Sequence, residues 1–124
     1  MKTLSGIEEA KAVIGEFQLS EFRIIRELRF YETETHSPCL EMTVESEERS
    51  PSYQLKLVFT GVRSLRLREF GGKQTRIIGL DVTDISERNW ENVCWQVMDY
   101  EDDNLNFLAK TATIVSFHDV TEKL

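Results

Sequence analysis

The sequence predicts an α+β fold, mainly β, in which an N-terminal helix packs on about seven antiparallel strands. Near the N-terminus, apolar residues recur at steps of three and four, which is the period of an amphipathic helix. Farther along, apolar and polar residues alternate in short runs, as in strands with one face toward water. Strand and helix patterns do not alternate, so we expect antiparallel sheets. A curved sheet, a sandwich and a partly open barrel all fit this pattern.

Length and composition favour one domain spanning residues 1–124. A chain of 124 residues is long enough for one hydrophobic core and too short for two. Hydrophobic residues make up 40% and charged residues 30%, a balance typical of globular proteins rather than disordered ones. A folded core is therefore expected.

The net charge of −7 disfavours nucleic acid and anionic membranes as direct ligands, because both attract a surplus of Lys and Arg. The same charge would speed encounter with a basic protein. We therefore expect a protein partner, basic if charge steers the encounter, with no nucleic acid and no membrane. A homo-oligomer is not predicted, although an exposed edge strand could pair across a two-fold axis.

The N-terminus lacks the apolar stretch of a signal peptide, and no segment approaches the roughly 20 apolar residues of a membrane span. Cys39 and Cys94 lie far apart in the sequence and do not resemble a disulfide framework. We expect reduced thiols and a cytoplasmic protein.

The first element is a helix predicted to begin near Gly6. Ser5 and Glu8 have the spacing of a capping box, in which each side chain accepts a hydrogen bond from a backbone N–H at the helix start. An apolar stripe follows and predicts that the helix ends near Phe17. Its members are Ile7, Ala10, Val13, Ile14 and Phe17.

Alternating residues predict the strands that follow. A bulge is expected in the first strand, where Ile25 and Arg26 are out of phase with their neighbours. The predicted strands cover residues 22–30, 40–45, 53–60, 65–68, 78–82, 93–97 and 105–109, and residues 113–117 extend or follow the last of them.

The strands at residues 53–60 and 65–68 are separated by Gly61 and are predicted to form a hairpin. In this arrangement, Leu65 and Leu67 face the core while Arg66 and Arg68 face away from it. Acidic residues of a neighbouring strand, such as Glu41 and Glu45, are then expected to pair with the two arginines.

Candidate metal and catalytic residues are few. His36, Cys39, Cys94 and His118 are the usual ligand types of zinc, but only His36 and Cys39 are close in the sequence. Cys94 lies within a predicted strand and is expected to be buried, whereas His118 is expected to be exposed. We predict no metal site, no cofactor, no catalytic residue and no enzymatic activity.

The predicted partner-binding residues lie within residues 87–104. Acidic side chains there are flanked by aromatic ones, and this combination suits a basic protein surface, because aromatic side chains supply buried contact while carboxylates steer the encounter. The predicted contacts are Trp90, Tyr100, Glu101, Asp102 and Asp103. The alternative is that Trp90 and Trp95 both belong to the core.

The runs YQLKLVFTGV at residues 53–62, LRL at 65–67 and IGLDV at 78–82 resemble small β-rich bacterial immunity proteins of the immunity protein 50 type. The resemblance implies a noncatalytic module that binds and neutralises a cognate toxin inside the producing cell. An acidic loop could then occupy the basic cleft of a nuclease toxin.

The alternative function is that of a small-molecule binder. A curved sheet covered by a helix can enclose an apolar cavity. Phe59, Trp95 and Phe107 are the residues predicted to line such a cavity.

Overall fold

The computed structural model describes residues 4–47, 52–68, 70, 75–77, 79–89, 91, 93–99 and 104–120. Its helical elements are an α-helix and two short 3₁₀ helices: α1 (Ile7–Ile14), η1 (Leu19–Glu21) and η2 (Ser86–Arg88). Its strands are β1 (Phe22–Glu32), β2 (Pro38–Ser46), β3 (Tyr53–Thr60), β4 (Arg63–Leu67), β5 (Thr75–Arg76), β6 (Leu80–Asp84), β7 (Trp95–Asp99), β8 (Leu105–Ala109) and β9 (Thr111–Asp119).

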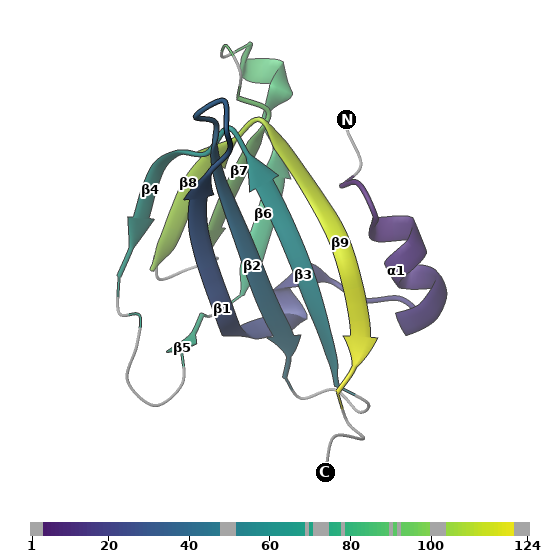
Figure 1. The fold of residues 1–124 in the computed structure, drawn as a ribbon. Coiled ribbons are helices and arrows are strands. Elements are labelled where there is room, and N and C mark those ends of the chain that lie inside the picture. The colour runs from purple at the N-terminus through teal and green to yellow at the C-terminus, as the bar shows by residue number, and fades with distance from the viewer. Residues whose placement is uncertain are drawn as a thin grey trace.

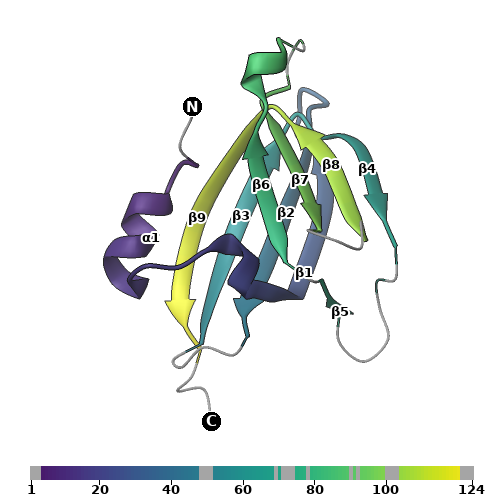
Figure 2. The ribbon, with the colours of Figure 1, turned by 180° about the vertical axis from the view of Figure 1, so that it is seen from behind.

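The strands form two antiparallel sheets that face each other (Figures 1 and 2). One sheet has five strands in the order β5-β1-β2-β3-β9, and the other has four in the order β4-β8-β7-β6. The two sheets share no strand pairing among the described residues and do not close into a barrel. The predicted mainly β fold is confirmed, and of the three architectures left open the structure adopts the sandwich.

The core lies between the sheets and is built from the inward side of each alternating strand. On β3, Leu55, Leu57 and Phe59 are fully buried, while the residues between them are partly exposed. β8 shows the same alternation. The period of two therefore places every second residue in the core, as the sequence predicts.

Helix α1 lies beside β9 (Figure 2), and its first turn differs from the predicted capping box. The N-cap is Gly6, at a φ of 88°, and no side chain caps the helix. The backbone oxygen of Ser5 instead accepts a hydrogen bond from Ile114 N–H at 2.8 Å. Ser5 is thus used for pairing with β9, and a Cβ at Gly6 would overlap the backbone oxygen of Ile114.

The helix ends at Ile14 rather than at Phe17. Gly15 is the C-cap, and its N–H donates to the backbone oxygen of Lys11 at 2.9 Å. Phe17 lies beyond the helix but is still buried, with its ring edge to face against Phe22 at a centroid distance of 5.5 Å. The apolar stripe therefore identifies Ala10, Ile14 and Phe17 as core residues correctly, but Val13 is 62% exposed, and the predicted helix end is three residues too late.

The predicted hairpin of residues 53–60 and 65–68 is wrong. β3 pairs with β2 and β9, whereas β4 pairs with β8 in the other sheet. The reason is the turn at Gly61, which has a φ of 62° and carries the chain from one sheet to the other. A Cβ there would lie 2.8 Å from the Cβ of Lys110, so the position requires glycine both for its backbone conformation and for space.

The side-chain orientation predicted for β4 is also wrong at Leu67, which is 41% exposed. The pairing of β4 with β8 shifts between Arg63 and Arg66, and Ser64 has a φ of 57°. A bulge therefore breaks the alternation on which the orientation rested. Glu41 and Glu45 belong to the five-stranded sheet and form ion pairs with Arg26, Arg29 and Lys56 of that sheet, whereas Arg66 belongs to the other sheet.

Among the helices that the structure describes, none is long and apolar enough to cross a membrane.

Candidate functional site

Four turns meet at one end of the sandwich, at the top of Figure 1. We call this end the loop end. It comprises the β1–β2 turn (residues 33–37), Gly61, the η2 segment (its described residues 85–89 and 91) and Lys110. The turns come from both sheets, so this end is built by segments far apart in the sequence.

Hydrogen bonds tie these turns to one another. Lys110 N–H donates to the backbone oxygen of Thr60 at 2.8 Å, and Val62 N–H donates to that of Pro38 at 3.0 Å. The guanidinium of Arg63 reaches the backbone oxygen of Glu91 at 3.4 Å. Pro38, Gly61, Arg63 and Glu91 line a shallow hollow of about 370 Å³ at this junction. The loop end is therefore a connected surface with a concave centre.

The β1–β2 turn is also ordered internally. His36 N–H donates to the backbone oxygen of Thr33 at 2.8 Å, and Ser37 N–H donates to its side-chain oxygen at 3.1 Å. His36 occupies a left-handed conformation with a φ of 64°, and its side chain is exposed. The turn thus projects exposed side chains from a fixed backbone.

The η2 segment is held by the carboxylate of Asp84. One of its oxygens accepts hydrogen bonds from the N–H and the hydroxyl of Ser86, at 2.8 and 2.6 Å. Glu87, Arg88 and Asn89 follow and are exposed. A turn fixed in this way loses little conformational freedom when a partner binds, which favours recognition.

The predicted contact residues Trp90, Tyr100, Glu101, Asp102 and Asp103 lie outside the described residues. Their described neighbours belong to two places. Asn89 and Glu91 lie at the loop end, whereas Asp99 and Asn104 lie at the opposite end of β7. Residues 87–104, predicted as one contact region, therefore extend from one end of the four-stranded sheet to the other.

Trp95 is 6% exposed and belongs to the core, as the alternative for this residue predicted. Phe59 and Phe107 are fully buried, and their rings contact each other edge to face, with centroids 5.0 Å apart. The three side chains named as the lining of an apolar cavity are thus packed into the core.

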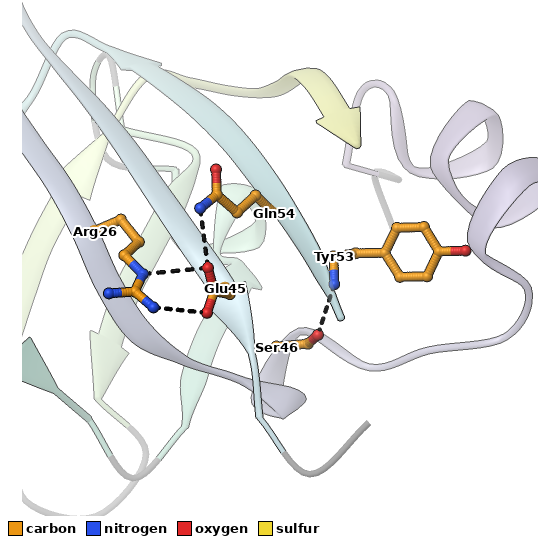
Figure 3. Close-up of polar contacts among 5 residues, drawn as sticks. All are labelled: Arg26, Glu45, Ser46, Tyr53 and Gln54. Carbon is orange, nitrogen blue, oxygen red and sulfur yellow. Dashed lines mark hydrogen bonds and ion pairs between the residues drawn. The ribbon is translucent and has the colours of Figure 1, made fainter. Parts of the chain in front are cut away.

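The outer face of the five-stranded sheet carries a second polar arrangement, centred on Glu45 of β2 (Figure 3). Arg26 of β1 donates two hydrogen bonds to its carboxylate at 3.2 and 2.8 Å, and Gln54 of β3 donates another at 2.9 Å. The hydrogen bond from Arg26 holds the pKa of the Glu45 carboxyl below its ordinary value, and the same contact raises the pKa of Arg26.

Glu41 lies four residues before Glu45 on the same face of β2. Lys56 of β3 lies 3.3 Å from its carboxylate, and Arg29 of β1 lies 3.9 Å from it. Each carboxylate therefore binds groups from both neighbouring strands. These contacts join β1, β2 and β3 and neutralise the charges within the face, so we assign them a structural role. The alternation in the sequence predicts that both glutamates face solvent, but it does not identify the residues with which they form ion pairs.

The candidate metal ligands are dispersed. His36 lies in the β1–β2 turn, whereas His118 is opposite Gln54 at the far end of β3 and is exposed, as predicted. Cys39 is buried, and Cys94 is half-buried just before β7. Within the described ranges, no group of three or more His, Cys, Asp or Glu residues is placed to hold a metal ion.

Comparison with known proteins adds no relative: no protein-family model matches the chain, and neither a curated protein nor a solved structure shows significant similarity to it.

Proposed function

We propose that the chain is a noncatalytic protein-binding module that contacts its partner through the loop end. The observation that carries this proposal is the network of hydrogen bonds connecting four turns from both sheets around one hollow. The residues in the turns of a β-sandwich can vary without disturbing the packing of the core, and binding residues are often found in such turns.

The charges of the loop end are mixed. Glu34, Glu87 and Glu91 are exposed there, and so are Arg63, Arg88 and Lys110. Such a surface recognises a partner by matching individual charges of both signs. The net charge of −7 in addition speeds the approach of a basic protein from a distance.

The narrower proposal is an immunity-type inhibitor that binds a bacterial toxin in the cytoplasm. It is supported by the resemblance of residues 53–62, 65–67 and 78–82 to immunity proteins and by the acidic balance of the chain. The fold suits this role because its two sheets form a rigid support for the turns. The partner-binding residues predicted from the sequence, Trp90 in particular, remain part of the proposal.

The test compares two charge-reversal variants in parallel affinity captures from the native cell extract. Glu34→Arg/Glu87→Arg changes two exposed carboxylates of the loop end. Glu8→Arg/Glu9→Arg makes the same change of charge on α1, away from the loop end.

The proposal predicts a stoichiometric protein that is captured by the wild type and the α1 variant and is lost with the loop-end variant. Equal capture by both variants would reject the loop end as the contact. If the captured protein is a toxin, adding the wild-type chain at equal concentration should abolish the toxin's activity. An unaffected toxin would reject the immunity role while leaving protein binding in place.

A further inference from the structure

Among the described residues, the second half of strand β1 has a pairing partner on one side only. The strand is 11 residues long and pairs with β2 along its whole length, but on its other side it pairs with β5 only at Ile24 and Ile25. Residues 27–32 thus have no second neighbour in the described part of the chain, and Figure 1 shows β5 beside only the beginning of β1. Such an edge is a template for another strand.

The backbone groups of this edge can be assigned from the turn that follows it. Thr33 N–H donates to Ser37, so Thr33 directs its groups toward β2. Pro38 has no N–H, and its oxygen is bonded to Val62 on the other side of β2. The pairing of residues 27–32 is regular, and alternate residues of an antiparallel strand point to opposite sides. Leu28, Phe30 and Glu32 therefore direct their N–H and C=O groups toward the free edge.

The side chains of this edge follow a pattern that complements itself. Glu27 and Arg29 are exposed on the outer face of the sheet, two residues apart and opposite in sign. Arg29 lies 3.9 Å from Glu41 and over the ring of Tyr31, and its side chain is still 62% exposed.

On the inner face, Leu28 is half-buried and Phe30 is 53% exposed. Edges that avoid pairing carry prolines, bulges or inward-pointing charges. Residues 27–31 contain no proline, their pairing with β2 is regular, and Phe30 on the inner face is exposed; the register shift lies before Glu27, and the inner-face charge, Glu32, lies at the end of the strand.

We propose that two copies of the chain associate through this edge, with their β1 strands antiparallel about a two-fold axis and Leu28 opposite Leu28 of the second copy. This register places Glu27 opposite Arg29 of the second copy, and the symmetry repeats the pair on the other side of the axis. The outward backbone groups of the two Leu28 residues then bond to each other. The two five-stranded sheets become one continuous sheet.

The charge pattern favours a second copy over an unrelated strand. About a two-fold axis, any contact between two different residues occurs twice. If Glu27 of one copy faces Arg29 of the other, then Arg29 of the first copy also faces Glu27 of the second, so both pairs join opposite charges. β5 also occupies the edge at Ile24 and Ile25, which limits the overlap to the few residues around Leu28. Phe30 then lies diagonally across from Leu28 of the second copy, which covers part of its exposed surface.

This surface is independent of the loop end. It lies along the side of the five-stranded sheet, whereas the loop end is formed by the turns at its top (Figure 1). Failure of self-association therefore says nothing about partner binding, and the reverse holds as well.

The test is a charge swap followed by sedimentation equilibrium over a range of concentrations. In Glu27→Arg or Arg29→Glu, like charges face each other twice, and the dimer dissociation constant should rise by about tenfold or more. In the double variant Glu27→Arg/Arg29→Glu, opposite charges face each other again and dimerisation should return. Glu9→Arg and Lys110→Glu are matched controls that change net charge elsewhere on the surface.

A monomeric wild type, or single and double variants with the same dissociation constant, would overturn the proposal. A cysteine pair tests the register independently of stability. Under a mild oxidant, Leu28→Cys should form a disulfide between copies, because directly opposite Cα atoms about 5.5 Å apart are within disulfide range. Glu32→Cys should not form one. Cross-linking that is equal at the two positions would contradict the register, and capture of a different protein by this edge would contradict the choice of occupant.

Discussion

The ring of Phe59 on β3 lies edge to face against the ring of Phe107 on β8, with centroids 5.0 Å apart and an interplanar angle of 80°. The two side chains belong to different sheets, and both are fully buried. This contact therefore packs the two sheets against each other in the core, and the two rings fill space that an apolar ligand would need.

Replacing Phe107 by alanine should lower the free energy of unfolding by about 3–5 kcal/mol, because the substitution removes buried surface and leaves a cavity. Chemical denaturation measures this change. Val115→Ala is the control, since Val115 is 51% exposed and its loss should cost less than about 1 kcal/mol. Equal losses for the two variants would contradict the assignment of Phe107 to the core.

Much of the fold could be predicted from the sequence, because the alternation of apolar and polar residues along a strand predicts which side chains are buried. Residues 53–60 and 105–109 alternate in the sequence and alternate in burial. The pairing of the strands was harder to predict from the sequence. Gly61 looks like a hairpin turn, but whether the chain returns to the same sheet depends on contacts made at a distance, here with Lys110 and Pro38.

A local sequence pattern also gave a wrong prediction where the backbone forms a tertiary hydrogen bond. Ser5 and Glu8 have the spacing of a capping box, yet the oxygen of Ser5 is bonded to Ile114 of β9. The loop end could not be predicted from the sequence either, because residues 33–37, Gly61 and Lys110 are far apart in the chain and the sandwich brings them together. The η2 segment was within the predicted region, since its polar and turn-forming residues stand out.

The stability of the protein should depend on the ionisation of Glu45. Its folded-state pKa is lowered from an ordinary value of 4.5, chiefly by the hydrogen bond from Arg26. A carboxyl group with a lowered pKa stabilises the fold above that ordinary value, and this contribution is lost as the pH falls through the folded-state pKa. The wild type should therefore lose more stability than Glu45→Gln when the pH is lowered from about 5 to about 3.

Thermal unfolding at a series of pH values measures this difference. The matched control is Glu34→Gln, which removes an exposed carboxylate of the β1–β2 turn and leaves the hydrogen bonds of Arg26 intact. Parallel curves for the wild type and Glu45→Gln between these pH values would show that the Arg26 contact does not stabilise the fold.

Gly61→Ala should destabilise the protein by about 1–2 kcal/mol, because residues other than glycine pay that cost in the left-handed conformation. The observed φ of 62° lies in this region. Gly61→Asn introduces the same Cβ near Lys110 but tolerates the conformation better, so its loss should be smaller. Denaturation of both variants separates backbone strain from crowding, and equal losses would assign the cost to crowding alone.

Asp84→Ala should loosen the η2 segment, because it removes the acceptor for both hydrogen bonds of Ser86. Loss of a hydrogen bond of this kind costs about 1 kcal/mol. Amide hydrogen exchange should become faster at residues 85–89 and stay unchanged in β3. If the loop end binds the partner, the affinity should fall as well, because a mobile turn must be ordered on binding. Faster exchange at residues 85–89 with unchanged affinity for the partner would show that the η2 segment is not part of the binding surface.

Amide hydrogen exchange of the chain with and without the captured partner shows whether the loop end is the surface that contacts a protein partner. If it is, slowed exchange should be concentrated in the β1–β2 turn, in the η2 segment and at Lys110, with little change along β1 or in the middle of β2 and β3. Protection along β1 or across the outer face of the five-stranded sheet, with exchange at the loop end unchanged, would show that the partner binds elsewhere.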